Sequence, residues 1–289
     1  MPRTAVVLVS LACALAACTG APDAESPPAA PSPSGAPRTA TASPTPEPVL
    51  RSATGRTYRI RIGEEARTTV TLTGAPGEKL RKEYEMAGRY VAPQVVPGGP
   101  LEGLSPDGRW LVLESHAPAP NERSNLMILS GTLDDDRDTI DLPGRFTFDA
   151  WSTRGDVLYL VEHKPPAGSG HYVVRAYDMR TQKLRKEPVA DKRNVEEQMA
   201  GQPVARGTTP RGDVVATLYL RQGEEAKEHG PFVHLLYVDE GLALCVDLPP
   251  GTPVTAGWQL THHRGSFVVG NASGAPAFRI DPTSGEVTS

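Results

Sequence analysis

The chain has 289 residues, with 30 basic and 34 acidic side chains and a formal net charge of −4. Because basic and acidic residues nearly balance, the chain lacks the excess of basic residues that binds nucleic acid, and it has no polybasic patch for anionic lipid. The composition therefore excludes a nucleic-acid partner.

Residues 1–17 predict a bacterial export signal. Arg3 precedes the apolar run Ala5–Ala17, which is shorter than the about 20 residues that a membrane-spanning helix needs. Small residues then lead directly into Cys18, and Leu15-Ala16-Ala17-Cys18 resembles the lipobox of bacterial lipoproteins. The resemblance implies that Cys18 is the lipid attachment site and the first residue of the mature chain. The alternative is an ordinary signal peptide with an incidental cysteine.

A lipidated Cys18 predicts an exported protein, lipid-anchored to the outer face of the cell membrane. Two acyl chains hold a protein on a membrane far more firmly than one. Cys13 lies inside the leader, so Cys245 is the only other cysteine of the mature chain and no disulfide is expected. Because Cys245 lies in an apolar, strand-like run, we interpret it as a buried, inert thiol.

Residues 18–49 predict a disordered tether. They are rich in Pro, Ala, Ser and Thr and lack a large apolar side chain before Val49, so nothing in the segment offsets the entropy of ordering. Proline-rich chain favours an extended form of about 3.1 Å per residue. The predicted organisation is thus a leader (1–17), a tether (18–49) and a folded domain (50–289).

The folded domain predicts an all-β structure, because short β-branched runs alternate with turn residues from about residue 50 onward. One helix is expected, at 194–201, where Asn194 can cap the N-terminus and Gly201 can end the turn. The expected strands are Tyr58–Ile62, Thr69–Thr73, Trp110–Leu113, Asn125–Leu129, Val157–Val161, Tyr172–Tyr177, Val214–Leu220, Val233–Val238 and Phe267–Val269.

These strands repeat with a period near 50. A glycine turn followed by an apolar strand recurs at Gly55, Gly108, Gly155, Gly212 and Gly265, and Lys-Leu-Arg-Lys-Glu occurs at both 79–83 and 183–187. About four strands for each repeat are typical of a β-propeller blade. A single blade cannot bury both of its apolar faces, whereas blades packed around an axis cover one another.

The second repeat carries the clearest motif, Ser105-Pro106-Asp107-Gly108-Arg109 followed by Trp110. It resembles the repeat of TolB-type propellers, and the other four copies are more degenerate. The resemblance covers residues 50–289 and implies a propeller strongly and a function only loosely. We expect about five blades, with four or six as alternatives. The first copy has little room for an inner strand and the last scarcely an outer one, so the ends could share a blade or leave the ring open.

No catalytic motif, metal-ligand pattern or cofactor fingerprint is found in the chain, so no catalytic residue, metal site or cofactor is predicted. His262 and His263 are adjacent on an expected strand, which directs their side chains to opposite faces. Packing inside blades is the expected role of the tryptophans, Trp110, Trp151 and Trp258.

The leading functional hypothesis is a non-catalytic binding platform in the cell envelope, whose partner is an envelope protein or a cell-wall ligand. TolB-like proteins act mostly as protein-binding platforms, so the resemblance implies a similar use. One alternative is a lactonase- or glycosidase-like propeller hydrolase acting at the channel mouth, with Asp107, Asp149, Asp156 and Asp213 as candidate groups. A hydrolase of this kind requires at least two carboxylates that lie close together at the channel. Another alternative is a sensory lipoprotein that modulates a membrane kinase.

Overall fold

The computed structural model describes residues 48–116, 123–134, 137–166, 168–191, 199–221, 229–252 and 257–289. The predicted leader, Cys18 and the tether up to residue 47 lie outside these residues. Most of the expected helix, 194–198, lies outside them as well. Its end does not continue a helix, because Met199–Ala200 form a short strand, β13, that pairs with β11. The described part of the chain contains no helix long and apolar enough to span a membrane.

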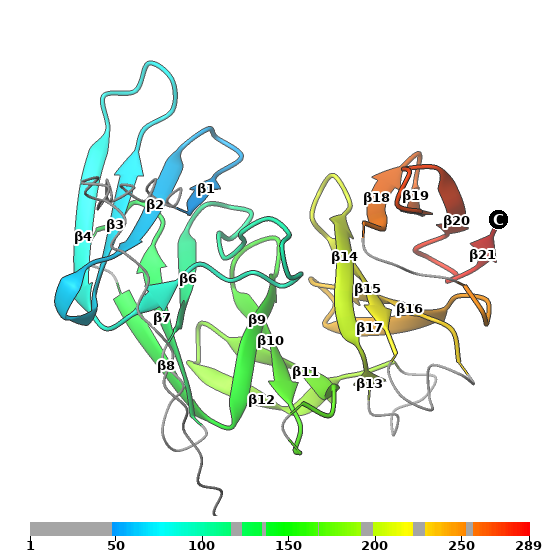
Figure 1. Cartoon of the computed structure of the whole chain (residues 1–289). Coiled ribbons are helices and arrows are strands. Elements are labelled where there is room, and N and C mark those ends of the chain that lie inside the picture. Colours follow the sequence, from blue (N-terminus) through cyan, green and yellow to red (C-terminus); the bar gives the residue numbers. More distant parts are fainter. Residues whose placement is uncertain are drawn as a thin grey trace, which may run out of the picture. The chain divides into compact units, whose positions relative to one another are not determined.

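Five antiparallel sheets follow one another along the chain, and each is built on a four-stranded meander whose neighbouring strands are consecutive in sequence (Figure 1). The third sheet also includes β13, which pairs with β11. The first sheet contains β1 (Val49–Arg51), β2 (Thr57–Ile62), β3 (Arg67–Thr73) and β4 (Arg81–Ala87). The second contains β5 (Tyr90–Val91), β6 (Trp110–Ser115), β7 (Arg123–Ser130) and β8 (Arg137–Pro143). The third contains β9 (Arg145–Trp151), β10 (Val157–His163), β11 (His171–Asp178) and β12 (Lys183–Val189). The fourth contains β14 (Gln202–Thr208), β15 (Val214–Leu220), β16 (Phe232–Tyr237) and β17 (Leu242–Asp247). The fifth contains β18 (Gln259–His263), β19 (Ser266–Gly270), β20 (Pro276–Ile280) and β21 (Val287–Thr288).

The all-β prediction is confirmed, and the five sheets agree with about five propeller blades. All nine predicted strands coincide with the second or third strand of a sheet; Val233–Val238 extends one residue beyond its strand, β16, and the other eight lie within theirs. The first blade has its own short inner strand, β1, and the last has a two-residue outer strand, β21, so the two ends of the domain do not share one blade. The first sheet begins at Val49, one residue earlier than predicted.

Apolar side chains are buried between consecutive blades. Four core clusters are present, each built from two sheets that follow one another in the chain. Trp151 and Trp258 are buried in two of them and Trp110 packs against one, as the sequence predicts. Middle strands contribute most of these side chains because they have a strand on either side and, in the second to fourth blades, a blade over each face.

The repeated glycines occupy equivalent corners, between the first and second strands of their sheets. All five have a positive φ, which favours residues without a Cβ. In the first four copies the glycine N–H donates to the carbonyl of the residue three positions earlier, at 2.9–3.0 Å; these residues are Ser52, Ser105, Ser152 and Thr209. Their hydroxyls accept a backbone N–H at the start of the second strand, at 2.9–3.1 Å.

The fifth copy turns more tightly. His263 pairs with Ser266, which leaves Arg264 and Gly265 as the two turn residues, with φ of 51° and 83°. Two successive residues with positive φ are typical of a type I′ hairpin. The Ser/Thr position used by the other four copies is therefore not needed in the last blade.

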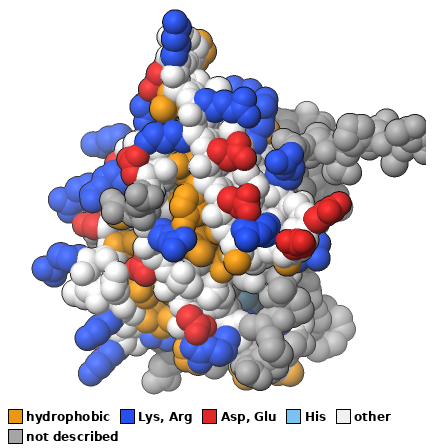
Figure 2. Space-filling model, turned by 90° about the vertical axis from the view of Figure 1, so that its left-hand side faces the viewer, with side chains coloured by type: hydrophobic (Ala, Val, Ile, Leu, Met, Phe, Trp, Pro, Cys, Tyr) orange, Lys and Arg blue, Asp and Glu red, His pale blue; other side chains and the backbone are white. Residues whose placement is uncertain are grey.

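Among the described residues, no core cluster joins the first sheet to the fifth. The outward face of the first sheet is polar: Arg59 and Arg61 on β2 and Glu83 and Glu85 on β4 are exposed, whereas Tyr58 on β2 is buried. Figure 2 shows Lys and Arg side chains interspersed with Asp and Glu on the side where β3 and β4 lie. A charged outer face is what an end blade needs when no further blade covers it.

Candidate functional site

A cavity of about 550 Å³ lies against residues of three consecutive blades. The second blade contributes Val95, which follows β5, and Glu114 of β6. The third contributes β9, β10 and the described residues of the loop that leads into β11. The fourth contributes the start of β14 and the end of β15. Pockets of this size hold a small molecule, and loops joining rigid strands commonly provide such sites.

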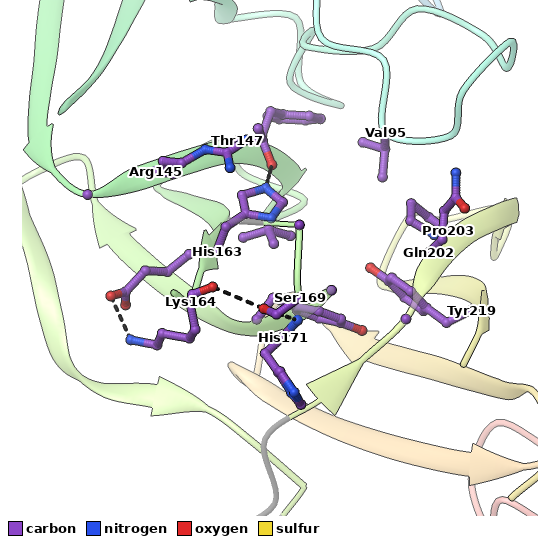
Figure 3. A pocket seen from close by; sticks show the side chains of 18 of the residues that line it. Val95, Arg145, Thr147, His163, Lys164, Ser169, His171, Gln202, Pro203 and Tyr219 are labelled. Carbon is purple, nitrogen blue, oxygen red and sulfur yellow. Dashed lines mark hydrogen bonds and ion pairs between the residues drawn. The ribbon is translucent and has the colours of Figure 1, made fainter. Parts of the chain in front are cut away.

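Polar side chains form one wall of the cavity. Arg145 and Thr147 are two residues apart on β9 and therefore lie on the same side of the strand. Thr147 Oγ1 lies 3.0 Å from Nε2 of His163, which ends β10 (Figure 3). Gln202, Pro203 and Tyr219 lie at the opposite wall. The cavity is thus bounded by a basic, polar wall and a wall that carries an aromatic ring.

Two stacked tyrosines form the buried side of the cavity. Tyr172 and Tyr219 have ring centroids 5.0 Å apart, and Tyr219 also stacks on Phe232 at 5.2 Å. Tyr172 is 2% exposed, and the side chain of Tyr219 is the polar group that interacts with its hydroxyl. Burial raises the pKa of Tyr172 far above its ordinary value, so its hydroxyl stays protonated and able to donate.

The charged side chains around the cavity differ in whether they form ion pairs with described residues. Glu162 accepts from Lys164 at 2.6 Å and from Arg175 at 2.8 Å. Burial alone would raise the pKa of Glu162, but these two cations outweigh it and lower that pKa. Arg145 forms no ion pair with any described residue. The pKa of His163 is lowered, first by burial and then by the charge of Arg145, so His163 is neutral at pH 7.

Glu114 is a half-buried carboxyl at the edge of the cavity. The backbone N–H of Phe148 donates to it, yet burial is the larger effect and raises its pKa. Burial favours the neutral form of an acid because the charged form loses its hydration.

Three of the four aspartates proposed for a hydrolase belong to the repeated turns. Asp107 accepts from the hydroxyl of Ser105 at 2.6 Å and Asp156 from that of Ser152 at 2.6 Å. Asp213 accepts from the hydroxyl of Thr209. Each carboxylate is therefore occupied in stabilising the turn of its own blade, and the three turns lie in three different blades.

The fourth aspartate, Asp149, does converge with another carboxylate, Glu102. Nη1 of Arg206 lies 2.9 Å from Asp149 Oδ1 and Nε of the same residue lies 3.2 Å from Glu102 Oε2. The Arg206 and Asp149 side chains are 6% and 3% exposed. Burial by itself would lower the pKa of Arg206, but Glu102 and Asp149 raise it. Burial raises the pKa of Glu102.

β-bulges on two inner strands accompany this ion network. The register between β9 and β10 shifts so that Asp149 has no partner residue on β10, and the register between β14 and β15 shifts just before Arg206. A bulge redirects side chains relative to the regular alternation. The network joins the second, third and fourth blades, and sequence reasoning named only Asp149 of its members.

Cys245 lies on β17, as its apolar run predicts, but it is half-buried rather than fully buried. Its Sγ lies 3.7 Å from the sulfur of Met199 on β13. His262 packs edge-on against Phe267, and His263 is exposed. No group of three or more His, Cys, Asp or Glu side chains among the described residues is arranged to hold a metal ion.

No family model matches the chain, and neither does any curated protein. Solved structures do match it. The tricorn protease shares 11% identity at a TM-score of 0.51, over 83% of this chain and 26% of the protease chain. TolB from Acinetobacter baumannii shares 13% identity at a TM-score of 0.43, over 83% of this chain and 56% of TolB. A nidogen/laminin complex matches with 10% identity and a TM-score of 0.43, over 84% of this chain and 78% of that one.

The chain thus spans about half of the TolB chain and about a quarter of the tricorn chain that it matches. At such low identity the likeness concerns the fold alone, and the chain has a β-propeller-like fold. Activity has to be argued from the chain's own residues.

Proposed function

We propose that the protein is a TolB-like lipoprotein of the bacterial cell envelope, held at the outer face of the membrane by lipid on Cys18. Its propeller is a non-catalytic platform that binds an envelope protein or a cell-wall ligand. The observation that carries the binding function is the cavity between the second, third and fourth blades, where polar and aromatic side chains meet. The lipobox-like sequence and the proline-rich tether support the location.

The observation that favours a hydrolase is the convergence of Asp149 and Glu102 at Arg206. A glycosidase needs two carboxyl groups facing a shared space that substrate and water can enter. Here a guanidinium lies between the two groups and the Asp149 side chain is 3% exposed. Neither residue lines the cavity. The geometry therefore supports a structural ion network better than a catalytic pair.

Replacing Cys18 by serine should abolish incorporation of labelled palmitate and move the protein from the membrane fraction to the soluble fraction. A hydroxyl cannot form the thioether that lipidation requires. The matched control is Cys245→Ser, which keeps Cys18 and should leave labelling unchanged. Palmitate labelling of Cys18→Ser at the level of the natural chain would contradict the proposed anchor.

A photo-reactive benzophenone amino acid at position 169 should give covalent adducts in intact cells, because Ser169 lines the cavity. The adduct is measured as an increase in the mass of the purified chain, which detects a small ligand as well as a protein. Position 83 is the matched control, since Glu83 is exposed on the outward face of the first sheet. Equal adduct yields at both positions, or none at either, would argue against a binding site at this cavity.

A further inference from the structure

The cavity has an aromatic side that suits a flat ring. Phe148, Val161 and the stacked pair of Tyr172 and Tyr219 all border it. Tyr219 lies in the middle of a stack, between Tyr172 and Phe232, so its edge rather than its face is left for a ligand ring. Aromatic pairs also form edge-to-face contacts, which such an edge can make. A volume of about 550 Å³ leaves room for one ring with its substituents.

The opposite wall presents an exposed arginine, Arg145, that forms no ion pair with any described residue. Lys164 is neutralised by Glu162 at 2.6 Å, whereas Arg145 has no anionic partner among the described residues. Arg145 lies close enough to His163 to lower the pKa of that imidazole, and Figure 3 shows both side chains at the same wall. An unpaired guanidinium beside a cavity can hold a carboxylate through two parallel hydrogen bonds.

We propose that this cavity binds a small aromatic carboxylate, with its ring against the edge of Tyr219 and its carboxylate on Arg145. This inference rests on the proposed binding function and specifies its ligand class. The charged and titratable groups that line the cavity together with His163 are Arg145 from β9, Glu162 and Lys164 from its own strand and loop, Glu114 from β6 and His171 from β11. Of these, Arg145 lowers the pKa of His163. A bound carboxylate adds one negative charge to this set and offsets Arg145.

The test compares benzoate with benzamide, which has nearly the same shape and no charge, by titration calorimetry on the purified chain. Benzoate should bind about tenfold more tightly. Arg145→Gln should abolish that preference, and Arg145→Lys should restore part of it. The matched control is Arg154→Gln, which removes an exposed arginine from the turn between β9 and β10 and should keep the preference.

A second measurement follows the imidazole of His163 by NMR at different pH values, with the resonance assigned from His163→Gln. Saturating benzoate should raise the pKa of His163, because the carboxylate offsets the cation that lowers it. Benzamide should leave that pKa unchanged. A purely structural role of Arg145 would produce no such shift.

Equal affinity for benzoate and benzamide, binding of neither, or a preference that persists in Arg145→Gln would each overturn the proposed ligand class. These failures are distinguishable from failure of the proposed function. Adducts at position 169 together with no benzoate preference refute the aromatic acid and leave the binding platform intact. Absence of both refutes the platform itself.

Discussion

Replacing Arg206 by methionine should lower the free energy of unfolding by about 3–5 kcal/mol. The substitution leaves Asp149, with a side chain only 3% exposed, without its cation, and removes the group that Glu102 faces at 3.2 Å. A buried carboxylate without its cation destabilises the fold, because burial removes its hydration and no opposite charge compensates for that loss. Urea denaturation of the purified chain measures the change.

The matched control for this prediction is Arg211→Met. Arg211 is also paired with an aspartate, Asp213, but its side chain is 89% exposed, so its loss should change the free energy of unfolding by less than about 1 kcal/mol. Adding Asp149→Leu to Arg206→Met should recover part of the loss, because no uncompensated carboxylate then remains at position 149. If both arginine variants unfold at the same urea concentration, the ion network does not hold the inner strands together.

Replacing Gly131 by alanine should lower the free energy of unfolding by about 3 kcal/mol. An added Cβ would lie 2.0 Å from the carbonyl oxygen of Gly108, and this neighbour is backbone in the repeated turn, which cannot rotate away. Gly131 also donates its N–H to the Arg109 carbonyl at 2.7 Å and accepts from the Tyr58 hydroxyl at 2.6 Å. The substitution therefore disturbs one turn and the contact between the first two blades together.

Gly63→Ala is the control for this effect. Gly63 lacks a positive φ and an added Cβ would meet nothing nearer than 3.8 Å, so this variant should unfold within about 1 kcal/mol of the natural chain. Thermal unfolding monitored by circular dichroism compares the two. A Gly131→Ala protein as stable as Gly63→Ala would show that the second blade can shift its turn without cost.

The Tyr58 hydrogen bond between the first two blades has an equivalent between the third and fourth blades. Tyr159 donates its hydroxyl to the Val238 carbonyl at 2.7 Å, just as Tyr58 donates to Gly131. The Val238 N–H in turn donates to the Asp213 carbonyl at 3.0 Å. Equivalent tyrosine hydrogen bonds thus join the first blade to the second and the third to the fourth, which supports the prediction that the chain is a series of copies of one sheet unit.

The middle strands were predictable from the sequence because burial on both faces requires continuous apolar runs, such as Val214–Leu220. The outer strands were not predictable in this way. β4 reads Arg-Lys-Glu-Tyr-Glu-Met-Ala, with exposed charges alternating with side chains that contact the neighbouring blade. Its position was nevertheless marked, since Lys-Leu-Arg-Lys-Glu overlaps the start of β4 and recurs at the start of β12.

Far less of the candidate site could be predicted from the sequence. Arg145, His163, Tyr172 and Tyr219 lie on four strands of two blades, and no short spacing relates them. Glu102 and Arg206 are separated by more than one hundred positions yet lie 3.2 Å apart. A local pattern cannot report contacts that depend on how blades pack and on where two inner strands bulge.

By itself, the sequence determined the strand-rich repeat, the glycine at each corner and the apolar middle strands, because backbone φ and periodic burial are local properties that each copy must satisfy. Only the tertiary structure decided that two carboxylates share Arg206, that Arg145 lines the cavity without an ion pair to any described residue, and that no core cluster of the described residues joins the first blade to the last. These features depend on relative positions of separate blades, which the packing of side chains between sheets determines.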